Sequence, residues 1–261
     1  MFRRPTVTGA PRAAYGVRTP ADEPTILATS GGLRPGRRTR FEFGPLLRFA
    51  IELSGATGRP RVCALDTAMG DQRFTQAFFA EAGEAAGVTV RFLNVYPMPN
   101  VADPEGFVLD HDVVWVGGGS VANLLALWRL HRYDEVMTTA WQAGVVLAGV
   151  SAGSICWHVG GTTDSFGPDL RPVTNGLGLL PFANGVHYDS EAQRRPLFQR
   201  LIAEGTLPDG YATDDGVGLH YRSTALVEAV SELPGKGAYA VRRDGGRALE
   251  ERIEPRVLAG S

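Results

Sequence analysis

The sequence predicts an α/β protein with a mostly parallel central sheet flanked by helices on both faces. From Thr25 to Gly161, segments typical of strands alternate with segments typical of helices. The strand segments are apolar at successive positions, as expected when helices cover both faces of a parallel sheet. After Gly161 the chain is rich in Pro, Gly and Asp, and short strand-like pieces reappear near the C-terminus.

The expected elements follow from the periodicity of apolar residues, from glycine, aspartate and turn residues at segment ends, and from segment length. Strands are indicated by short β-branched or apolar runs that end in Gly, Asp or a turn: 25–31, 59–67, 88–95, 111–120, 144–150, 217–221, 224–230 and 237–243. Helices are indicated by apolar residues three and four apart, often closed by glycine: 44–55, 72–87, 121–131, 133–144 and 152–161. We expect residues 1–24 to be a flexible tail and residues 25–261 to form a single domain.

Composition excludes several classes of protein. The 261 residues carry a net charge of −2, which gives no electrostatic reason to expect nucleic acid or a membrane surface as partner. No apolar run approaches the roughly 18 residues that span a bilayer, and the N-terminus lacks the apolar segment of a signal peptide. The two cysteines, Cys63 and Cys156, are not spaced as metal ligands. We therefore expect a cytoplasmic protein without metal or cofactor.

The segment GVSAGS, residues 149–154, is the most informative motif. It reads G-x-S-x-G between a predicted strand and a predicted helix, the context of a nucleophile elbow. Ser151 would then project above the carboxyl edge of the sheet, and the N–H of Ala152 would point toward a developing oxyanion. The alternative is a tight turn in which Ser151 only caps the helix.

A serine nucleophile needs a general base, and the chain has five histidines: His111, His131, His158, His187 and His220. His111 begins a strand at the opposite edge, His131 ends a helix, and His220 lies inside a strand. On a continuous helix His158 would lie about 10 Å from Ser151 by helical rise. Elimination leaves His187, which follows the nucleophile by only 36 positions and so leaves little room for an α/β-hydrolase arrangement.

The base should be oriented by a carboxylate. Asp164 and Asp215 are the main candidates because both lie at loop ends, whereas Asp169, Asp189 and Asp214 are weaker ones. Each could instead make a local turn.

A second glycine-rich strand end, VGGGS at residues 116–120, completes the pattern. Gly117, Gly119 and Ala122 formally match a dinucleotide fingerprint, but they do not follow the first strand and no acidic strand end lies about 20 residues on. We expect this loop beside Ser151, where the N–H of Gly118 or Gly119 supplies a second oxyanion donor.

Together these motifs resemble the peptidase E family of serine peptidases, family S51. Its wider fold is that of class I glutamine amidotransferases, and its relatives include cyanophycinase. The resemblance covers roughly residues 25–243 and rests on four segments: GGGSVANLL (117–125), AGVSAGS (148–154), TTDSFGP (162–168) and GVHYD (185–189).

The resemblance implies a role for each matching residue. Ser151 matches the nucleophile, His187 the base, and Asp164 the third charge-relay residue, while Asp215 lies where related sequences can carry a glutamate proposed for that role. Gly118, Gly119 and Ala152 match the oxyanion loop. Ser120 replaces the asparagine usual in peptidase E.

The resemblance also implies a substrate, a dipeptide with N-terminal aspartate, whose carboxylate needs a cation. Arg194, Arg195 and Arg171 are the candidates for that cation. A β-aspartyl or cyanophycin-like peptidase, an esterase, and a non-catalytic binding protein of the same fold stay open. A homodimer also stays open.

Overall fold

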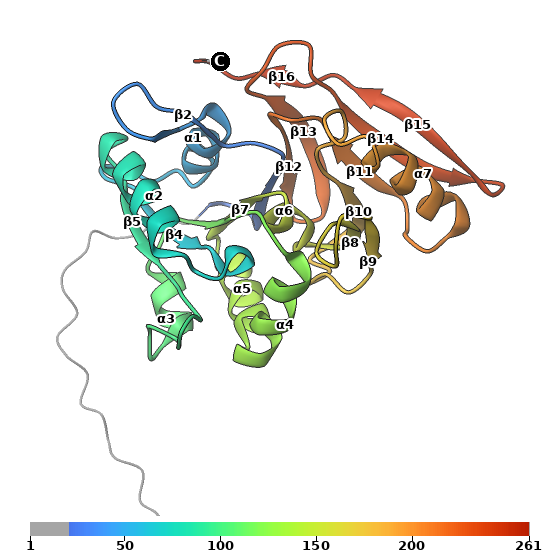
Figure 1. Ribbon diagram of the computed structural model, residues 1–261. Coiled ribbons are helices and arrows are strands. Elements are labelled where there is room, and N and C mark those ends of the chain that lie inside the picture. Colours follow the sequence, from blue (N-terminus) through green and yellow to red (C-terminus); the bar gives the residue numbers. More distant parts are fainter. Residues whose placement is uncertain (1–20, 261) are drawn as a thin grey trace, which may run out of the picture.

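The computed structural model describes residues 21–260, which form two large sheets and the helices packed on them (Figure 1). Of the expected N-terminal tail, residues 1–20 lie outside the described part of the chain. Residues 21–24 run beside the body of the protein, where the Ala21 N–H donates to the Gly144 carbonyl at 3.0 Å. The first strand begins at Thr25, as predicted.

The larger sheet has eight strands, five of them mutually parallel. Its order is β16 (Arg256–Val257), β13 (Ala225–Ser231), β12 (Val217–Arg222), β1 (Thr25–Thr29), β7 (Val146–Val150), β6 (Val113–Val116), β4 (Arg61–Leu65) and β5 (Thr89–Phe92). Strands β12 and β13 extend the parallel part through antiparallel pairing. The carboxyl ends of β1, β7, β6 and β4 therefore meet at one edge.

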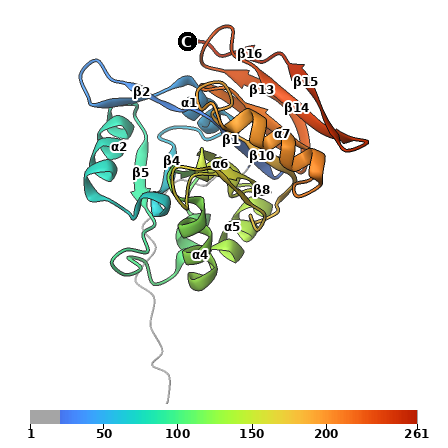
Figure 2. The same ribbon diagram turned by 45° about the vertical axis from the view of Figure 1, so that its right-hand side comes forward.

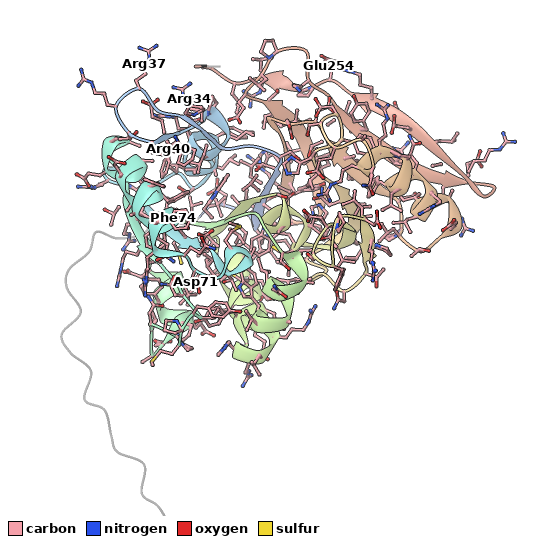
Figure 3. All side chains as sticks on the ribbon, viewed as in Figure 1. Arg34, Arg37, Arg40, Asp71, Phe74 and Glu254 are labelled. Atoms are coloured by element: carbon pink, nitrogen blue, oxygen red, sulfur yellow. The ribbon has the colours of Figure 1, made fainter. Side chains whose placement is uncertain are left out.

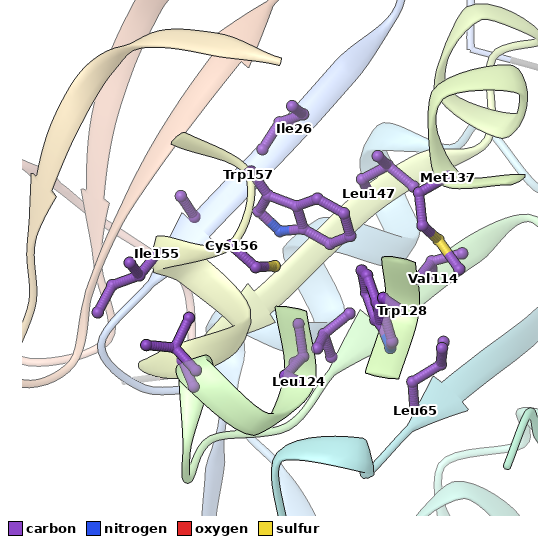
Figure 4. Packing of buried hydrophobic residues seen from close by; sticks show 14 of the residues in the cluster. Ile26, Leu65, Val114, Leu124, Trp128, Met137, Leu147, Ile155, Cys156 and Trp157 are labelled. Atoms are coloured by element: carbon purple, nitrogen blue, oxygen red, sulfur yellow. The ribbon is translucent and has the colours of Figure 1, made fainter. Parts of the chain in front are cut away.

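Alternate residues of the central strands pack on opposite faces of this sheet. In β7, Leu147 joins the cluster under α3 (Pro104–Leu109), α4 (Val121–His131) and α5 (Tyr133–Gln142), whereas Val146 and Ala148 join the cluster under α1 (Pro45–Leu53) and α2 (Arg73–Ala85). Figure 4 shows the first cluster, in which the rings of Trp128 and Trp157 lie 5.8 Å apart. The predicted fold class, a mostly parallel sheet with helices on both faces, is confirmed.

A second sheet lies beside the first, and all its strands come from the part of the chain between His158 and Ile253 (Figure 2). Its order is β15 (Arg247–Ile253), β14 (Ala238–Asp244), β11 (Gly210–Thr213), β10 (Leu180–Gly185), β8 (His158–Thr163) and β9 (Arg171–Val173). Helix α7 (Arg194–Glu204) packs its apolar residues on this sheet. A short hairpin of β2 (Leu33–Pro35) and β3 (Phe41–Phe43) and the turn η1 (Thr67–Met69) complete the described elements.

The helix expected over residues 152–161 is wrong beyond its first turn. Helix α6 (Ala152–Ile155) ends after this turn, and His158 begins strand β8. The reason is tertiary: a Cβ at Gly160 would lie 2.0 Å from the Val173 carbonyl oxygen, and one at Gly161 would lie 2.2 Å from that of Asn184. These glycines allow neighbouring strands to approach closely.

No helix within residues 21–260 is both long enough and apolar enough to cross a membrane.

The crossing of β7, α6 and β6 requires glycine at two positions. A Cβ on Gly153 would lie 2.2 Å from the Val116 carbonyl oxygen, and one on Gly149 would lie 2.4 Å from the Gly153 carbonyl oxygen. Both neighbours are backbone atoms, which cannot move without disturbing the sheet. The two outer residues of G-x-S-x-G are therefore set by packing.

We expect Gly153→Ala to lower the free energy of unfolding by about 3 kcal/mol or more, as overpacking against backbone does. Urea titration of the variant would measure this. Gly87→Ala is the control, because its Cβ would meet nothing within 4 Å and only its φ of 72° is strained. It should cost about 1 kcal/mol, and an equal loss in both variants would contradict the packing argument.

A pH dependence of stability is expected from His158, which is fully buried. Burial lowers its pKa to about 4, against the hydrogen bond between its Nδ1 and the Ser154 carbonyl. Between these two pKa values, about 6.5 and about 4, the His158 imidazole is protonated in the unfolded chain but neutral in the folded chain. The free energy of unfolding should therefore fall as the pH drops from about 6.5 to about 4. This group contributes about 3 kcal/mol at most. Urea titrations at several pH values should show a shallower dependence in His158→Asn, and an unchanged dependence would contradict this assignment.

Candidate active site

Ser151 lies at the turn between β7 and α6, at the carboxyl edge of the larger sheet. Its φ of 57° and ψ of −112° lie outside the regions that non-glycine residues prefer. The Ser151 N–H donates to the Thr29 carbonyl at 3.0 Å, which anchors the turn to the end of β1. Ser151 occupies the N-cap position of α6, but its side chain makes no capping hydrogen bond. The hydroxyl has no hydrogen-bond partner among residues 21–260, as expected of a group available to substrate.

The glycine loop after β6 lies against this serine. A Cβ on Gly118 would lie 3.3 Å from the Ser151 Cβ and 3.8 Å from its Oγ. The loop is held by the N–H groups on either side, since Gly117 donates to the Leu65 carbonyl and Ser120 to the Ala68 carbonyl. Gly118 therefore lies beside Ser151, where the sequence predicts an oxyanion donor.

The other two predicted donors differ in their surroundings. Ala152 follows Ser151 directly, at the first position of α6. A Cβ on Gly119 would instead meet the Ala68 carbonyl oxygen at 2.6 Å and the Met69 sulfur at 3.0 Å. Within the described residues, the N–H groups of Gly118, Gly119 and Ala152 have no hydrogen-bond partner. Gly118 and Ala152 thus form the better-placed pair beside Ser151.

His187 is brought to the same edge by Ser30, the residue after β1. The His187 N–H donates to Ser30 Oγ at 3.2 Å, and that hydroxyl also shares a 2.7 Å hydrogen bond with Thr213 Oγ1. His187 has a φ of 52°, so its backbone is strained like that of Ser151. Because Thr29 binds the nucleophile turn and Ser30 binds the histidine turn, two consecutive residues position both segments.

The carboxylate beside His187 is that of Asp215. His187 Nδ1 and Asp215 Oδ1 are 2.6 Å apart. When Nδ1–H donates to this carboxylate, Nε2 carries the free lone pair of a base. Of the carboxylates left open by the sequence, the structure places Asp215 against the imidazole.

Asp215 is itself held by a second carboxylate. Its N–H donates to Asp189 Oδ1 at 2.9 Å, and Asp189 Oδ2 pairs with Lys236. Partial burial opposes ionisation of Asp189, but the hydrogen bonds from Lys236 and Asp215 lower its pKa. Lys236, the single lysine of the chain, thus keeps a charged acceptor under the Asp215 turn.

Asp164 lies elsewhere. It follows β8, is exposed, and lines a separate 500 Å³ depression together with Glu191 and Gln193. Its carbonyl accepts from the Gly167 N–H at 3.0 Å, which makes a local turn. The Asp214 carboxylate is hydrogen-bonded to other groups, because its Oδ2 accepts from the Gly237 N–H at 2.8 Å and from Tyr239 Oη at 3.3 Å. Asp169 is exposed near the same turn as Asp164.

The remaining histidines do not share this environment. His111 and His158 are fully buried, and burial lowers the pKa of each to about 4. Burial also lowers the pKa of His220, which faces Glu228 across β12 and β13.

Within residues 21–260, no three His, Cys, Asp or Glu side chains come together as metal ligands.

Two of the three predicted substrate arginines are paired with other groups of the protein. Arg194 is buried, with its Nε 2.7 Å from Glu191 Oε2 and its Nη1 bound to the Thr162 carbonyl. Arg195 pairs with Glu250 and stacks on Tyr188 and Tyr239. Arg171 is exposed on strand β9.

Sequence reasoning missed Ser30 and the Asp189–Lys236 pair. The position of Ser30, directly after the first buried strand, was the available signal, because polar residues at carboxyl strand ends face the ligand edge. Asp189 is one of the weaker carboxylate candidates from the sequence, but no local pattern predicts its pairing with Lys236, which is 47 positions away.

Comparisons with known proteins identify the family to which this chain is similar. The family model described as peptidase family S51 matches residues 26–228. An uncharacterized peptidase of Bacillus subtilis is 42% identical over 184 residues, which are 70% of this chain and 78% of that protein. A peptidase E of Shewanella amazonensis is 35% identical over 37% of this chain and 41% of its own length. The crystal structure of a peptidase from an acI-B1 actinobacterium shares the fold, with a TM-score of 0.62 and 17% identity over 88% of this chain and 94% of the other.

We expect Asp215→Asn to lower kcat by about 10³- to 10⁴-fold, because the imidazole loses its orienting charge. Asp164→Asn, the matched control at the other predicted position, should change kcat by less than about threefold, as substitution of an exposed side chain does. Hydrolysis of a p-nitrophenyl ester and labelling of Ser151 by a fluorophosphonate would measure both. A larger loss in Asp164→Asn than in Asp215→Asn would reverse the assignment.

Proposed function

Because the chain belongs to peptidase family S51, a family of serine peptidases, we propose that it hydrolyses small peptides through an acyl-enzyme on Ser151. One observation carries the proposal: the strained Ser151, whose hydroxyl has no hydrogen-bond partner within residues 21–260, lies between two supports at one sheet edge. On the β6 side is the Gly118 loop, and on the β1 side is His187 with Asp215.

The geometry supports a two-step reaction. Ser151 Oγ bonds to the scissile carbonyl carbon while His187 Nε2 takes its proton, and the N–H groups of Gly118 and Ala152 bind the oxyanion. The C–N bond then breaks as His187 returns the proton to the leaving amine. In the second step water adds to the acyl carbon while His187 Nε2 takes its proton. The bond between that carbon and Ser151 Oγ then breaks, His187 returns the proton to Oγ, and the acyl group leaves as a carboxylic acid. Asp215 stabilises the imidazolium formed in both steps.

The substrate expected from the resemblance, a dipeptide with N-terminal aspartate, is one finer form of this proposal. Its support is the family and the relatives named peptidase E. It requires a cation for the side chain of the substrate, and the guanidinium groups of Arg194 and Arg195 are already paired. A β-aspartyl or cyanophycin-like peptide and an ester are the other substrates to compare. A cytoplasmic location, supported by two buried free thiols, is part of the proposal.

We expect Ser151→Ala to lower kcat on every cleaved substrate by about 10⁶-fold, since the acylation step is removed. Release of free amino acid from Asp-Leu, β-Asp-Leu and Leu-Leu, and of p-nitrophenol from p-nitrophenyl acetate, measures this. A Ser154→Ala variant is the matched control, because Ser154 is buried nearby and bonds Asn184 Oδ1 at 2.8 Å. Equal hydrolysis by wild type and Ser151→Ala would overturn the mechanism.

A further inference from the structure

A cavity of about 430 Å³ opens directly beside the nucleophile turn. Gly117 and Gly118 of the glycine loop line it, as does Val150, the residue before Ser151. The cavity lies above the ends of β4 and β6 and is covered by α2 and the β2–β3 hairpin. It is therefore continuous with the proposed oxyanion site.

The walls of this cavity are aromatic. Six rings line it: Phe41, Phe74, Phe78, Phe79, Phe92 and Trp115. Neighbouring rings meet edge to face, with centroids 6.1 Å apart for Phe41 and Phe78 and 6.3 Å for Phe74 and Phe78. Phe74, labelled in Figure 3, is 60% exposed, and Met69 and Leu33 are also exposed at the rim. Such a surface gains most from a large apolar side chain.

Two charged residues are among the lining residues within the described chain, Asp66 and Arg40. Asp66 Oδ2 accepts from Thr75 Oγ1, and its Oδ1 lies 2.6 Å from the position of a Cβ on Gly117. The carboxylate is therefore beside the glycine loop. Burial raises the pKa of Asp66, so a cation that reaches it would favour its charged form. Arg40 lies on the hairpin at the outer rim, with its guanidinium 5.5 Å from the Phe41 ring centroid.

The sheet order decides which part of a peptide reaches this cavity. Strand β7, which ends at Ser151, lies between β1 and β6. His187, which must protonate the leaving amine, is held at the end of β1 by Ser30. The leaving group therefore departs on the β1 side. The acyl residue extends to the opposite side, over β6 and β4, where the cavity lies.

We propose that this cavity binds the N-terminal residue of a short peptide, with a large apolar side chain against the aromatic rings and the α-ammonium at Asp66. The inference rests on the proposed serine peptidase function and specifies its substrate class. An aspartate side chain fits the cavity poorly, because it would leave the rings uncovered and place a second carboxylate near Asp66. The free α-ammonium is attached to the same Cα as the apolar side chain, and it pairs with the Asp66 carboxylate next to the glycine loop.

The test compares kcat/KM for Phe-Leu, Leu-Leu, Ala-Leu, Asp-Leu and N-acetyl-Phe-Leu. Wild type should prefer Phe-Leu over Ala-Leu by about 100-fold, the range that apolar pockets achieve. Asp-Leu and the acetylated peptide should be at least about tenfold poorer than Phe-Leu, since each lacks a matched partner. Asp66→Asn should slow Phe-Leu while leaving N-acetyl-Phe-Leu unchanged.

Phe74→Ala should lower kcat/KM for Phe-Leu about fivefold and leave Ala-Leu unchanged, because only the large side chain contacts the ring. Leu130→Ala is the matched control, since Leu130 is 73% exposed on α4 and does not line the cavity. A preference for Asp-Leu that is lost in Arg40→Ala, or equal effects of Phe74→Ala on all peptides, would overturn the inference.

Binding to Ser151→Ala separates this inference from the catalytic proposal. Calorimetry with phenylalaninamide and aspartamide should show at least about tenfold tighter binding of the former, and Phe74→Ala in that background should weaken it. If no peptide is hydrolysed but this preference holds, the peptidase proposal fails and the cavity assignment stands. Equal binding of the two amides, or none, overturns the assignment even if Ser151-dependent hydrolysis is observed.

Discussion

The close approach of three backbone segments at Gly149, Gly153 and Val116 is the constraint on which the rest of the site depends. Strand β7 must turn into α6 within one residue, and that residue is Ser151 at a φ of 57°. Glycine on both sides removes the Cβ atoms that would push α6 off the sheet. The same packing that permits the turn also places Ser151 at the carboxyl edge of the sheet, so the architecture of the fold and the position of the proposed nucleophile have one cause.

The two sheets meet at this edge and contribute different parts of the site. The larger sheet provides Ser151 and Gly118 from its parallel strands, whereas His187 follows β10 of the second sheet and Asp215 follows β11. Ser30 joins them, because its hydroxyl accepts from His187 and bonds Thr213 while its backbone pairs with Val217 and Gly216. The short polar side chain of Ser30, at the end of β1, thus links the parts of the site that come from the two sheets.

The parallel sheet and its helices could be predicted because their signals are local. Apolar runs such as residues 144–150 are long enough to define strands that are buried on both faces. The second sheet could not be predicted as well, since β8 and β10 contain glycines that are needed for close strand contact and that weaken the apolar pattern. For the same reason residues 156–161 were expected as helix and are largely strand.

The sequence by itself determined the nucleophile motif, the glycine loop and the histidine, because each follows an identifiable strand end or survives elimination. Only the tertiary structure decided between Asp215 and Asp164, and it did so by placing the turn after β11, rather than the one after β8, against His187. It alone also showed the engaged arginines and the aromatic cavity. These depend on contacts between residues far apart in the chain, such as Phe41 with Phe78 and Arg195 with Glu250, and no short segment of sequence encodes such contacts.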